Sequence, residues 1–378
     1  MNVKFGDVVK EVKSNVDRAN NPYEFYVAGD HMDSEDFRIH RHGCFATDDV
    51  GPAFVRIFHP GQVLYGSRRT YLKKVCVADF DGICANTTFV LETKDENVLI
   101  QRLLPFLMLS NGFTEWSIKH SKGSTNPYVL FSDLADYEFD LPPMDEQKKL
   151  AELLWAANYL KEKYKKAITA TDEMLKAKFR EMFSGVGDDA SRGGEETQRV
   201  RTIALGDIGR VCMCKRVLAS QTRKEGDIPF FKISTFGGVA DSFISHSLFM
   251  EYKERYPYPQ KGAILISAAG TIGKCVVFDG KPAYFQDSNI VWIDNDETKI
   301  SNAFLCCCYR YISWQTTKGG IIERLYNDNI RKTIIPLPPL SLQREFVAIA
   351  DKAEAAKANL KKSIAAIDQV MKGLINNV

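Results

Sequence analysis

Leu141-Pro-Pro-Met-Asp-Glu-Gln147 returns 196 residues later as Leu337-Pro-Pro-Leu-Ser-Leu-Gln343, and each copy leads into a long helical pattern. The two prolines block helix upstream, and Asp145 or Ser341 is well placed to cap the helix that follows. Behind each copy, apolar residues recur every seven positions with Lys and Glu between them, which is typical of a coiled coil. The repeated stretch therefore predicts two long helices that share one register.

Each predicted helix presents a narrow seam of two apolar rows. In the first helix one row is Leu150, Ala157, Tyr164 and Thr171, and the other is Leu153, Leu160, Ala167 and Met174. In the second helix one row is Phe346, Ala353, Leu360, Ile367 and Leu374, beside Ile349, Ala356 and Val370. A mutual coiled coil explains such a seam, and two helices packed separately on their own domains are the alternative. We expect coiled-coil or partner contacts from Leu150, Ala157, Leu160, Tyr164, Phe346, Ala353, Leu360 and Ile367.

Further pairs of motifs outside the helices return in the same order. Phe5-Gly-Asp-Val8 returns as Leu205-Gly-Asp-Ile208, and Gly61-Gln-Val-Leu64 returns as Gly262-Ala-Ile-Leu265. Single positions follow in step: Thr70 with Thr271, Lys73 with Lys274, Val75 with Val276, Trp116 with Trp314 and Lys122 with Lys318. So many ordered matches indicate an internal duplication.

The segments before the helices are short β-rich runs bounded by Gly, Asp and Pro, at 63–65, 83–91, 263–266, 275–278 and 289–293. A smaller helix is expected in each half, at 98–109 and 301–314. The fold class is therefore α+β: two β-rich domains separated by two long antiparallel coiled-coil helices with pseudo-twofold repetition. The expected segments are domain one at 1–143, helix one at 144–184, a linker at 185–201, domain two at 202–339 and helix two at 340–378.

Composition and charge restrict the class of protein. The 378 residues carry a formal net charge of +2, so a polyanion partner would need locally clustered Lys and Arg. No apolar signal-peptide core and no long apolar stretch occurs, which predicts a soluble cytoplasmic protein without a membrane span. The nine cysteines lack a framework or zinc spacing, and Cys306–Cys308 are expected to be buried, inert thiols in a helix.

Basic residues cluster where the β-rich runs turn. No acid lies between Gln62 and Ala78, around Arg68 and Arg69, and a second acid-free stretch follows Arg210. Such loops can contact phosphates and base edges, although charged surface loops without a ligand are the ordinary alternative. The expected DNA contacts are Arg68, Arg69, Thr70, Lys73, Lys122, Lys215, Arg216, Ser267, Thr271, Lys274, Lys318 and Arg324.

Patterns for catalysis are missing. Neither an amino-methylation box nor a Gly-rich S-adenosylmethionine motif occurs, and Ser267–Lys274 lacks residues that a P-loop requires. Asp81 with Glu92-Thr-Lys94 loosely resembles a nuclease arrangement, but acid-x-Lys triplets are common by chance. The histidines lack metal spacing. We expect no catalytic residue, metal or cofactor.

Several of these motifs resemble the target-recognition domains of type I restriction–modification specificity subunits. They are Gly61–Lys73 with Ala78–Gly82, Lys119–Thr125, Leu141–Gln147, Ile264–Lys274 and Ile335–Gln343, which occur in the family's order along nearly the whole chain. One departure is Ser341-Leu342 where the first copy has Asp145-Glu146.

The resemblance implies a non-catalytic subunit that recognises a bipartite site in double-stranded DNA. Each domain would read one half of the site, and helix length would set the unread spacer. Two methyltransferase subunits would bind the helices, and restriction subunits would join through them. The alternatives are the recognition subunit of a type IIB-like or orphan methylation system, a coiled-coil scaffold that binds only protein, and a nuclease resting on Asp81, Glu92 and Lys94.

Overall fold

The computed structural model describes residues 1–183, 200–314, 316–319 and 322–376, and these fall into two units. Unit 1 contains Met1–Lys166 with Leu360–Val378, and unit 2 contains Ala167–Asn359. Each unit therefore combines one β-rich part with portions of both long helices. Most of the predicted linker, 184–199, lies outside the described residues. The domain boundaries given above stay predictions.

Unit 1 contains a sheet of order β2-β9-β6-β7, a sheet of order β4-β3-β8-β5 and the pair β1-β10. Its strands are β1 (Asn2–Lys4), β2 (Val9–Glu11), β3 (Phe25–Val27), β4 (Gly43–Cys44), β5 (Phe54–Phe58), β6 (Val63–Gly66), β7 (Val75–Val77), β8 (Gly82–Ala85), β9 (Thr88–Thr93) and β10 (Glu138–Asp140). Its helices before the long one are α1 (Phe5–Val8), α2 (Leu104–Leu107), α3 (Asn111–Lys119) and α4 (Phe131–Ala135), with short 3-10 helices at Arg18–Asn20, Gly29–His31, Thr70–Leu72 and Gln101–Leu103.

Unit 2 contains a sheet of order β12-β18-β15-β16, a sheet of order β14-β13-β17 and the pairs β11-β21 and β19-β20. Its strands are β11 (Arg201–Ala204), β12 (Gly209–Met213), β13 (Ile228–Phe231), β14 (Phe243–Ile244), β15 (Ile264–Ser267), β16 (Cys275–Val277), β17 (Tyr284–Phe285), β18 (Ile290–Asn295), β19 (Thr317–Gly319), β20 (Ile322–Arg324) and β21 (Ile334–Leu337). Its shorter helices are α6 (His246–Arg255), α7 (Asn302–Tyr311) and α8 (Asn327–Lys332), with 3-10 helices at Leu205–Asp207 and Ala219–Gln221.

The same topology occurs in both units. The order β2-β9-β6-β7 of unit 1 is repeated as β12-β18-β15-β16 in unit 2, with antiparallel neighbours in each. A parallel pair, β3 with β8, returns as β13 with β17. The closing pair β1-β10 returns as β11-β21. The predicted internal repeat and the α+β class are confirmed.

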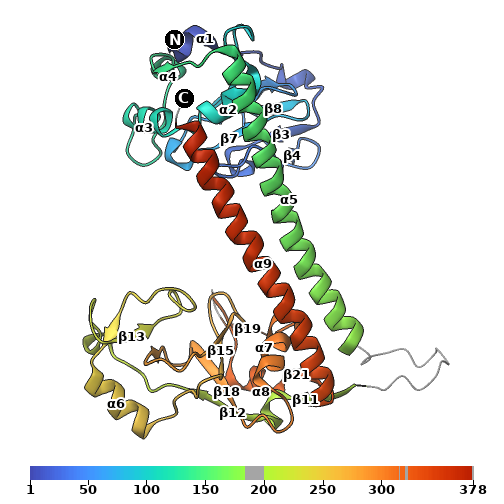
Figure 1. The fold of residues 1–378 in the computed structure, drawn as a ribbon, viewed down its shortest axis with the longest axis vertical. Helices are drawn as coiled ribbons and strands as arrows, with labels where there is room; N and C mark the ends of the chain where they lie inside the picture. Colours follow the sequence, from blue (N-terminus) through green and yellow to red (C-terminus); the bar gives the residue numbers. More distant parts are fainter. Residues whose placement is uncertain (184–199, 315, 320–321, 377–378) are drawn as a thin grey trace, which may run out of the picture. The chain divides into compact units, whose positions relative to one another are not determined.

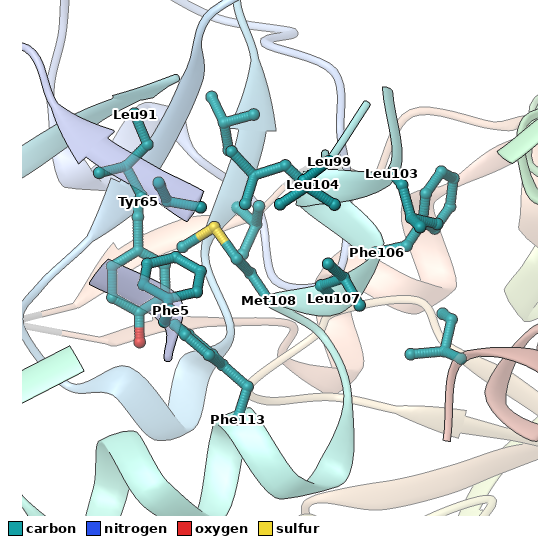
Figure 2. Close-up of a cluster of buried hydrophobic side chains, with 14 of the residues drawn as sticks. Phe5, Tyr65, Leu91, Leu99, Leu103, Leu104, Phe106, Leu107, Met108 and Phe113 are labelled. Carbon is teal, nitrogen blue, oxygen red and sulfur yellow. The ribbon is translucent and has the colours of Figure 1, made fainter. Parts of the chain in front are cut away.

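Alternate residues of the central strand enter two different cores in each unit. In unit 1, Val63 and Tyr65 of β6 lie in one cluster, whereas Leu64 lies in another with Cys76. In unit 2, Ile264 and Ile266 belong to one cluster and Leu265 to another. Successive strand side chains point to opposite faces, so a strand buried on both faces reads as a continuous apolar run. Figure 2 shows part of the first core, where Tyr65, Phe5 and Phe113 meet.

The repeated Gln residues lock the start of each long helix. Gln147 is buried; its Nε2 donates to the carbonyls of Val98 (2.8 Å) and Pro142 (2.9 Å), and its Oε1 accepts from the Ile100 amide. Gln343 is also buried and makes the equivalent set of bonds, to Lys299 O, Pro338 O and the Ser301 amide. A buried amide needs such partners, which explains why the motif ends in Gln each time.

The long helices are α5 (Met144–Phe183) and α9 (Leu340–Ile375), each one uninterrupted helix (Figure 1). In unit 1, Leu150 and Ala157 from the start of α5 pack in the same cluster as Ile367 and Leu374 from the end of α9. In unit 2 the end of α5 packs with the start of α9, as the contact of Phe179 with Phe346 illustrates. The helices are therefore antiparallel within each unit. They also pack on the β-rich parts. The mutual helix pairing and the packing of each helix on a domain, which were alternatives from the sequence, therefore occur together.

One row of the predicted seam is shifted by one residue. Leu160 is 41% exposed and Leu153 is 58% exposed, whereas Leu154 and Leu175 are buried. The second row of α5 therefore continues from Leu154 through Lys161, so Leu160 lies outside the intramolecular seam and its contact with a partner stays a prediction. The second row predicted for α9 is shifted in the same way, because Ala356 and Val370 are exposed whereas Ala350 and Met371 are buried. In α5, Ala167 and Met174 of the second row are also exposed. Buried or half-buried positions of the first rows are Leu150, Ala157, Tyr164, Phe346, Ala353, Leu360 and Ile367. The helical face that contains Leu154 also covers the unit 1 core, and this burial decides between the adjacent leucines.

The smaller elements differ in detail from the prediction. The helix expected at 98–109 is only a 3-10 turn followed by α2, and the run 83–91 is divided between β8 and β9. The helix expected at 301–314 is α7. Among the described helices, none has both the length and the apolar character needed to cross a bilayer.

Candidate nucleic-acid interface

In unit 1 the basic loop between β6 and β7 projects two arginines. The Gly66 amide donates to Lys74 O at 3.0 Å and closes the base of this loop. Arg69 (φ 50°) and Lys73 (φ 49°) adopt left-handed backbone conformations, which are uncommon for side-chain-bearing residues. Such conformations cost free energy and persist where the surroundings enforce them. The side chains of Arg68 and Arg69 are exposed.

A second loop, 121–130, is joined to the first by backbone hydrogen bonds. Tyr128 forms antiparallel bridges with both Arg68 and Lys122, and the Arg69 amide donates to Pro127 O at 2.6 Å. Tyr128 is 42% exposed. The two loops therefore form one surface, called here surface 1, with Arg68, Arg69, Lys122 and Tyr128. Sequence reasoning missed Tyr128, because only the bridges place it beside the arginines.

Two predicted contacts of unit 1 have structural partners instead. Thr70 is 3% exposed, and its Oγ1 lies 3.3 Å from Ser121 Oγ, so it joins the two loops from beneath. Lys73 is half-buried and its Nζ lies 3.3 Å from Glu35. The expectation that Thr70 contacts DNA directly conflicts with this burial, and we withdraw it.

In unit 2 the corresponding turn follows β15. The Ser267 amide donates to Lys274 O at 2.9 Å, and its hydroxyl donates to Thr271 O inside the turn. Ser267 is 1% exposed, whereas Thr271 and Lys274 are exposed. The expected direct contact from Ser267 is withdrawn for the same reason as that from Thr70. Ser267 holds the turn that presents Thr271 and Lys274.

Lys274 is the structural counterpart of Lys74 rather than of Lys73. Each closes its loop with its carbonyl, and each donates its Nζ to a backbone carbonyl at 2.5 Å: Lys74 to Gly29 and Lys274 to Phe236. The pairing of Val63 with Val77 and of Ile264 with Val277 gives the same correspondence. The loop of unit 1 is therefore one residue longer than the loop of unit 2. The sequence motifs had paired Lys73 with Lys274 because they did not show that the additional residue lies before Lys74.

Two further segments lie beside the unit 2 turn. Arg324 is exposed and bridges Ala269, and the Ala268 amide donates to Asn289 O at 2.7 Å. Near Asn289, Asp287 accepts from Arg216 Nε at 2.7 Å. Thr271, Lys274, Arg324 and Arg216 are called surface 2. Lys215 is exposed and lies over the Tyr256 ring, 5.0 Å from its centroid, and the side chain of Lys318 lies outside the described part of the chain.

Each surface contains a cation that is paired with an acidic side chain. Among the described residues, no acidic side chain forms an ion pair with Arg68 or Arg69. Lys122 lies 3.0 Å from Asp133 and lowers the pKa of that carboxyl, while Arg216 is paired with Asp287. Exposed ion pairs contribute little to the free energy of folding, so a phosphate can compete with the acidic side chain for such a cation. Unpaired arginines present five donors each and match guanine or phosphate acceptors.

The three residues of the loosely nuclease-like arrangement each have partners of their own in the described part of the chain. Asp81 is bonded to His59, Glu92 to Gln62 and Lys10, and the Lys94 Nζ to Gly6 O. Asp81, Glu92 and Lys94 therefore each serve a separate contact.

One group in the described part of the chain, Asp36, His40 and Glu162, has the spacing of a metal site. The Lys165 ammonium already lies 3.2 Å from Asp36 and 2.9 Å from Glu162. A cation of the chain itself thus compensates both carboxylates, and we assign no metal to them.

Comparison with known proteins matches both halves of the chain to one family. The family model of the type I restriction modification DNA specificity domain matches residues 51–170 and 198–369. A protein of Haemophilus influenzae named as a type I restriction enzyme specificity subunit is 53% identical over 173 residues, 46% of this chain and 45% of its own length. The type I restriction enzyme EcoDI specificity subunit of Escherichia coli is 25% identical over 183 residues, 47% of this chain and 39% of its own length. The matched region spans less than half the length of these relatives.

Solved structures resemble the fold over the whole chain. A chain from a study of complex assembly and conformational transition of the type I R-M system has a TM-score of 0.60 at 20% identity, covering 100% of this chain and 96% of that one. The type I restriction-modification S subunit from M. genitalium has a TM-score of 0.56 at 15% identity, covering 100% and 95%. At these identities the likeness concerns the fold.

Proposed function

Because this chain belongs to the family of type I restriction–modification DNA specificity proteins, we propose that it recognises a bipartite DNA site and directs its partner subunits there. The observation that carries the proposal is the repetition of one loop architecture in two units. Each unit closes a loop with a lysine carbonyl and anchors that lysine to a second backbone carbonyl. A protein with two equivalent reading surfaces suits a site with two half-sites.

The chemistry of surface 1 suits contacts to both bases and phosphates. Arg68 and Arg69 are exposed and, among the described residues, have no ion-pair partner. Arginine pairs with guanine O6 and N7 in the major groove, and neutralised phosphates release counterions. Surface 2 presents Thr271 and Lys274 from the corresponding loop. The side chains differ between the surfaces, so the two half-sites are expected to differ in sequence.

The long helices provide the surface for partner subunits. Leu153 and Leu160 of α5 are exposed, lie one heptad apart and point away from the buried row. Exposed apolar rows mark interaction sites. We assign this row to a methyltransferase subunit, with two such subunits per chain and restriction subunits joining through them. Those subunits bind S-adenosylmethionine and carry the catalytic groups, and this chain provides sequence-specific DNA recognition without catalysis.

Helix length sets the distance between half-sites in this proposal. The 40 residues of α5 correspond to about 60 Å of helix at the usual rise. We expect the length of this helix to set the number of unread base pairs between the half-sites, as half-site spacing follows protein geometry in other DNA-binding proteins.

Selection from random duplex DNA tests the proposal. The full chain, purified with its methyltransferase subunit, is expected to enrich one motif with two specified parts and a constant unread gap. Its affinity is expected to fall steeply with salt, since phosphate contacts release counterions. Enrichment of a continuous motif would contradict the two-surface arrangement. Salt-independent or absent DNA binding would favour the protein scaffold.

A further inference from the structure

Two thiols of unit 2 lie close together behind surface 2. Cys275 is the first residue of β16 and is half-buried, and Cys306 is buried in α7. Their Sγ atoms are 3.7 Å apart, and Cys275 Sγ lies 3.9 Å from Cys306 O. A disulfide has an S–S length of about 2.05 Å, so closure needs an approach of under about 2 Å. This geometry differs from the expectation that Cys306 is an inert thiol.

The surroundings of the pair favour a thiolate at Cys275. A hydrogen bond from the Cys306 thiol, and the nearby Arg310 guanidinium, lower the pKa of Cys275 below its usual range, against the opposing effect of burial. The pKa of Cys306 is raised by the same contact and by burial. Burial raises the pKa of Cys76 and of Cys84 to about 12. A thiolate is the reactive form of cysteine, so Cys275 differs chemically from these buried thiols.

The pair is coupled to the turn that carries Thr271 and Lys274. Cys275 directly follows Lys274 in the chain. The neighbouring Gly273 has φ +78°, and a Cβ there would lie 2.3 Å from Trp314 Nε1, so this turn packs tightly on the segment after α7. Trp314 Nε1 in turn donates to Tyr309 O at 3.3 Å. Drawing Cys275 toward Cys306 therefore pulls on the turn against the segment that supports it.

We propose that Cys275 and Cys306 form a reversible disulfide that changes DNA reading by surface 2 alone. Unit 1 has no equivalent pair, because Val75 opposite Tyr65 occupies the position that Cys275 occupies opposite Ile266. The effect on DNA rests on the proposed function, whereas formation of the disulfide does not. The device makes one half-site sensitive to oxidation and leaves the other unaffected.

The oxidant is a hydroperoxide such as hydrogen peroxide. The Cys275 thiolate attacks one peroxide oxygen, the S–O bond forms, the O–O bond breaks, and the leaving hydroxide takes a proton to become water. Cys306 sulfur then attacks the Cys275 sulfenic sulfur; the S–S bond forms and the S–O bond breaks. The second hydroxide leaves with the Cys306 proton as water. Two thiols are oxidised and one peroxide is reduced to two waters, and a dithiol reductant reverses the change.

Peptide mass spectrometry tests the disulfide. The full chain is treated with hydrogen peroxide without denaturant, alkylated and digested. The expected product is one linked peptide that joins Cys275 to Cys306, about 2 Da lighter than the two reduced peptides together. Cys275→Ser and Cys306→Ser should each abolish it, while Cys307→Ser and Cys44→Ser, the matched controls, should retain it. Absence of the linked peptide in the wild type, or its persistence in Cys306→Ser, would overturn the proposal.

A binding measurement tests the consequence. With duplexes altered in one half-site at a time, oxidation is expected to lower discrimination at one half-site roughly fivefold or more. The reductant should restore it, and the other half-site should be unaffected. Equal loss at both half-sites, or no loss despite the linked peptide, would contradict the proposal. Failure of the reduced protein to select DNA would instead refute the proposed function, while the linked peptide would still decide the chemistry.

Discussion

Lys161 and Lys357 are 196 residues apart, and each donates to an aspartate on the other long helix. Lys161 Nζ lies 2.7 Å from Asp368 in unit 1, and Lys357 is bonded to Asp172 in unit 2. Asp172 and Asp368 are also 196 residues apart. This is the offset of the Pro-Pro-x-x-x-Gln motifs, so the repeat extends through the helices to their ion pairs. Charged pairs at seam positions specify the register of paired helices.

Removing one partner of this pair is expected to cost more than replacing the lysine by an apolar residue. Lys161 has a side-chain exposure of only 12%, so Asp368→Ala leaves a largely buried ammonium without its carboxylate. We expect a loss of about 1–3 kcal/mol in the free energy of unfolding. Lys161→Met keeps the volume and removes the charge, and it is expected to be close to neutral. Urea unfolding of both variants measures the difference; equal losses would show that the charge pair has no specific role.

Adjacent leucines of α5 provide a matched test of the seam. Leu154 is 0% exposed, and Leu154→Ala is expected to cost about 2–5 kcal/mol, whereas Leu153→Ala should change stability by about 0.5 kcal/mol or less. The order reverses for partner binding: Leu153→Ala combined with Leu160→Ala should weaken association with the methyltransferase subunit. Urea unfolding and co-purification measure the two effects. A stable Leu154→Ala variant would refute the shifted seam, and full association of the double variant would refute the docking row.

Substitutions of the surface 1 arginines and of Lys274 are expected to affect recognition of different half-sites. Arg68→Ala or Arg69→Ala is expected to weaken recognition of one half-site, by roughly 1–3 kcal/mol and with relaxed specificity if a base edge is contacted. Lys274→Ala should affect the other half-site. If Arg68 or Arg69 contacts phosphate, all sequences should weaken alike and the salt slope should fall by about 1. Arg102→Ala, also exposed in unit 1, is the control. Equal effects of these variants on both half-sites would argue against two reading surfaces.

Substitution of Gly273 tests the packing of the unit 2 turn against Trp314. Gly273→Ala places a Cβ 2.3 Å from Trp314 Nε1 at φ +78°, a conformation that is costly for alanine. We expect a loss of about 1–3 kcal/mol in stability and weaker reading of the surface 2 half-site. At Gly238 a Cβ would meet only Thr235 O at 3.5 Å, so Gly238→Ala is the control. Unfolding by urea and half-site binding check this prediction. Wild-type behaviour of Gly273→Ala would contradict the assigned packing.

Sequence patterns predicted the features that repeat and missed those that depend on neighbours. The Pro-Pro-x-x-x-Gln motif predicted both long helices, because its prolines act locally and its Gln bonds a proline carbonyl within the motif itself. The choice between Leu153 and Leu154 depends on the core packed beneath α5, and a seven-residue spacing does not contain that information. The burial of Thr70 depends on a loop that is 51 residues distant in the chain. Loop contacts of this kind decide which polar residues reach the surface.

The most direct test of the central claim is a map of N6-methyladenine across the genome of a host that lacks its own adenine methylation. The host expresses this chain together with its methyltransferase subunit, and matched cells express the methyltransferase alone. The account predicts methylation at one interrupted, two-part motif, and only when this chain is present. Arg68→Ala should relax one part of that motif while the other part is retained. Methylation of a continuous motif, or the same methylation pattern without this chain, would contradict the account.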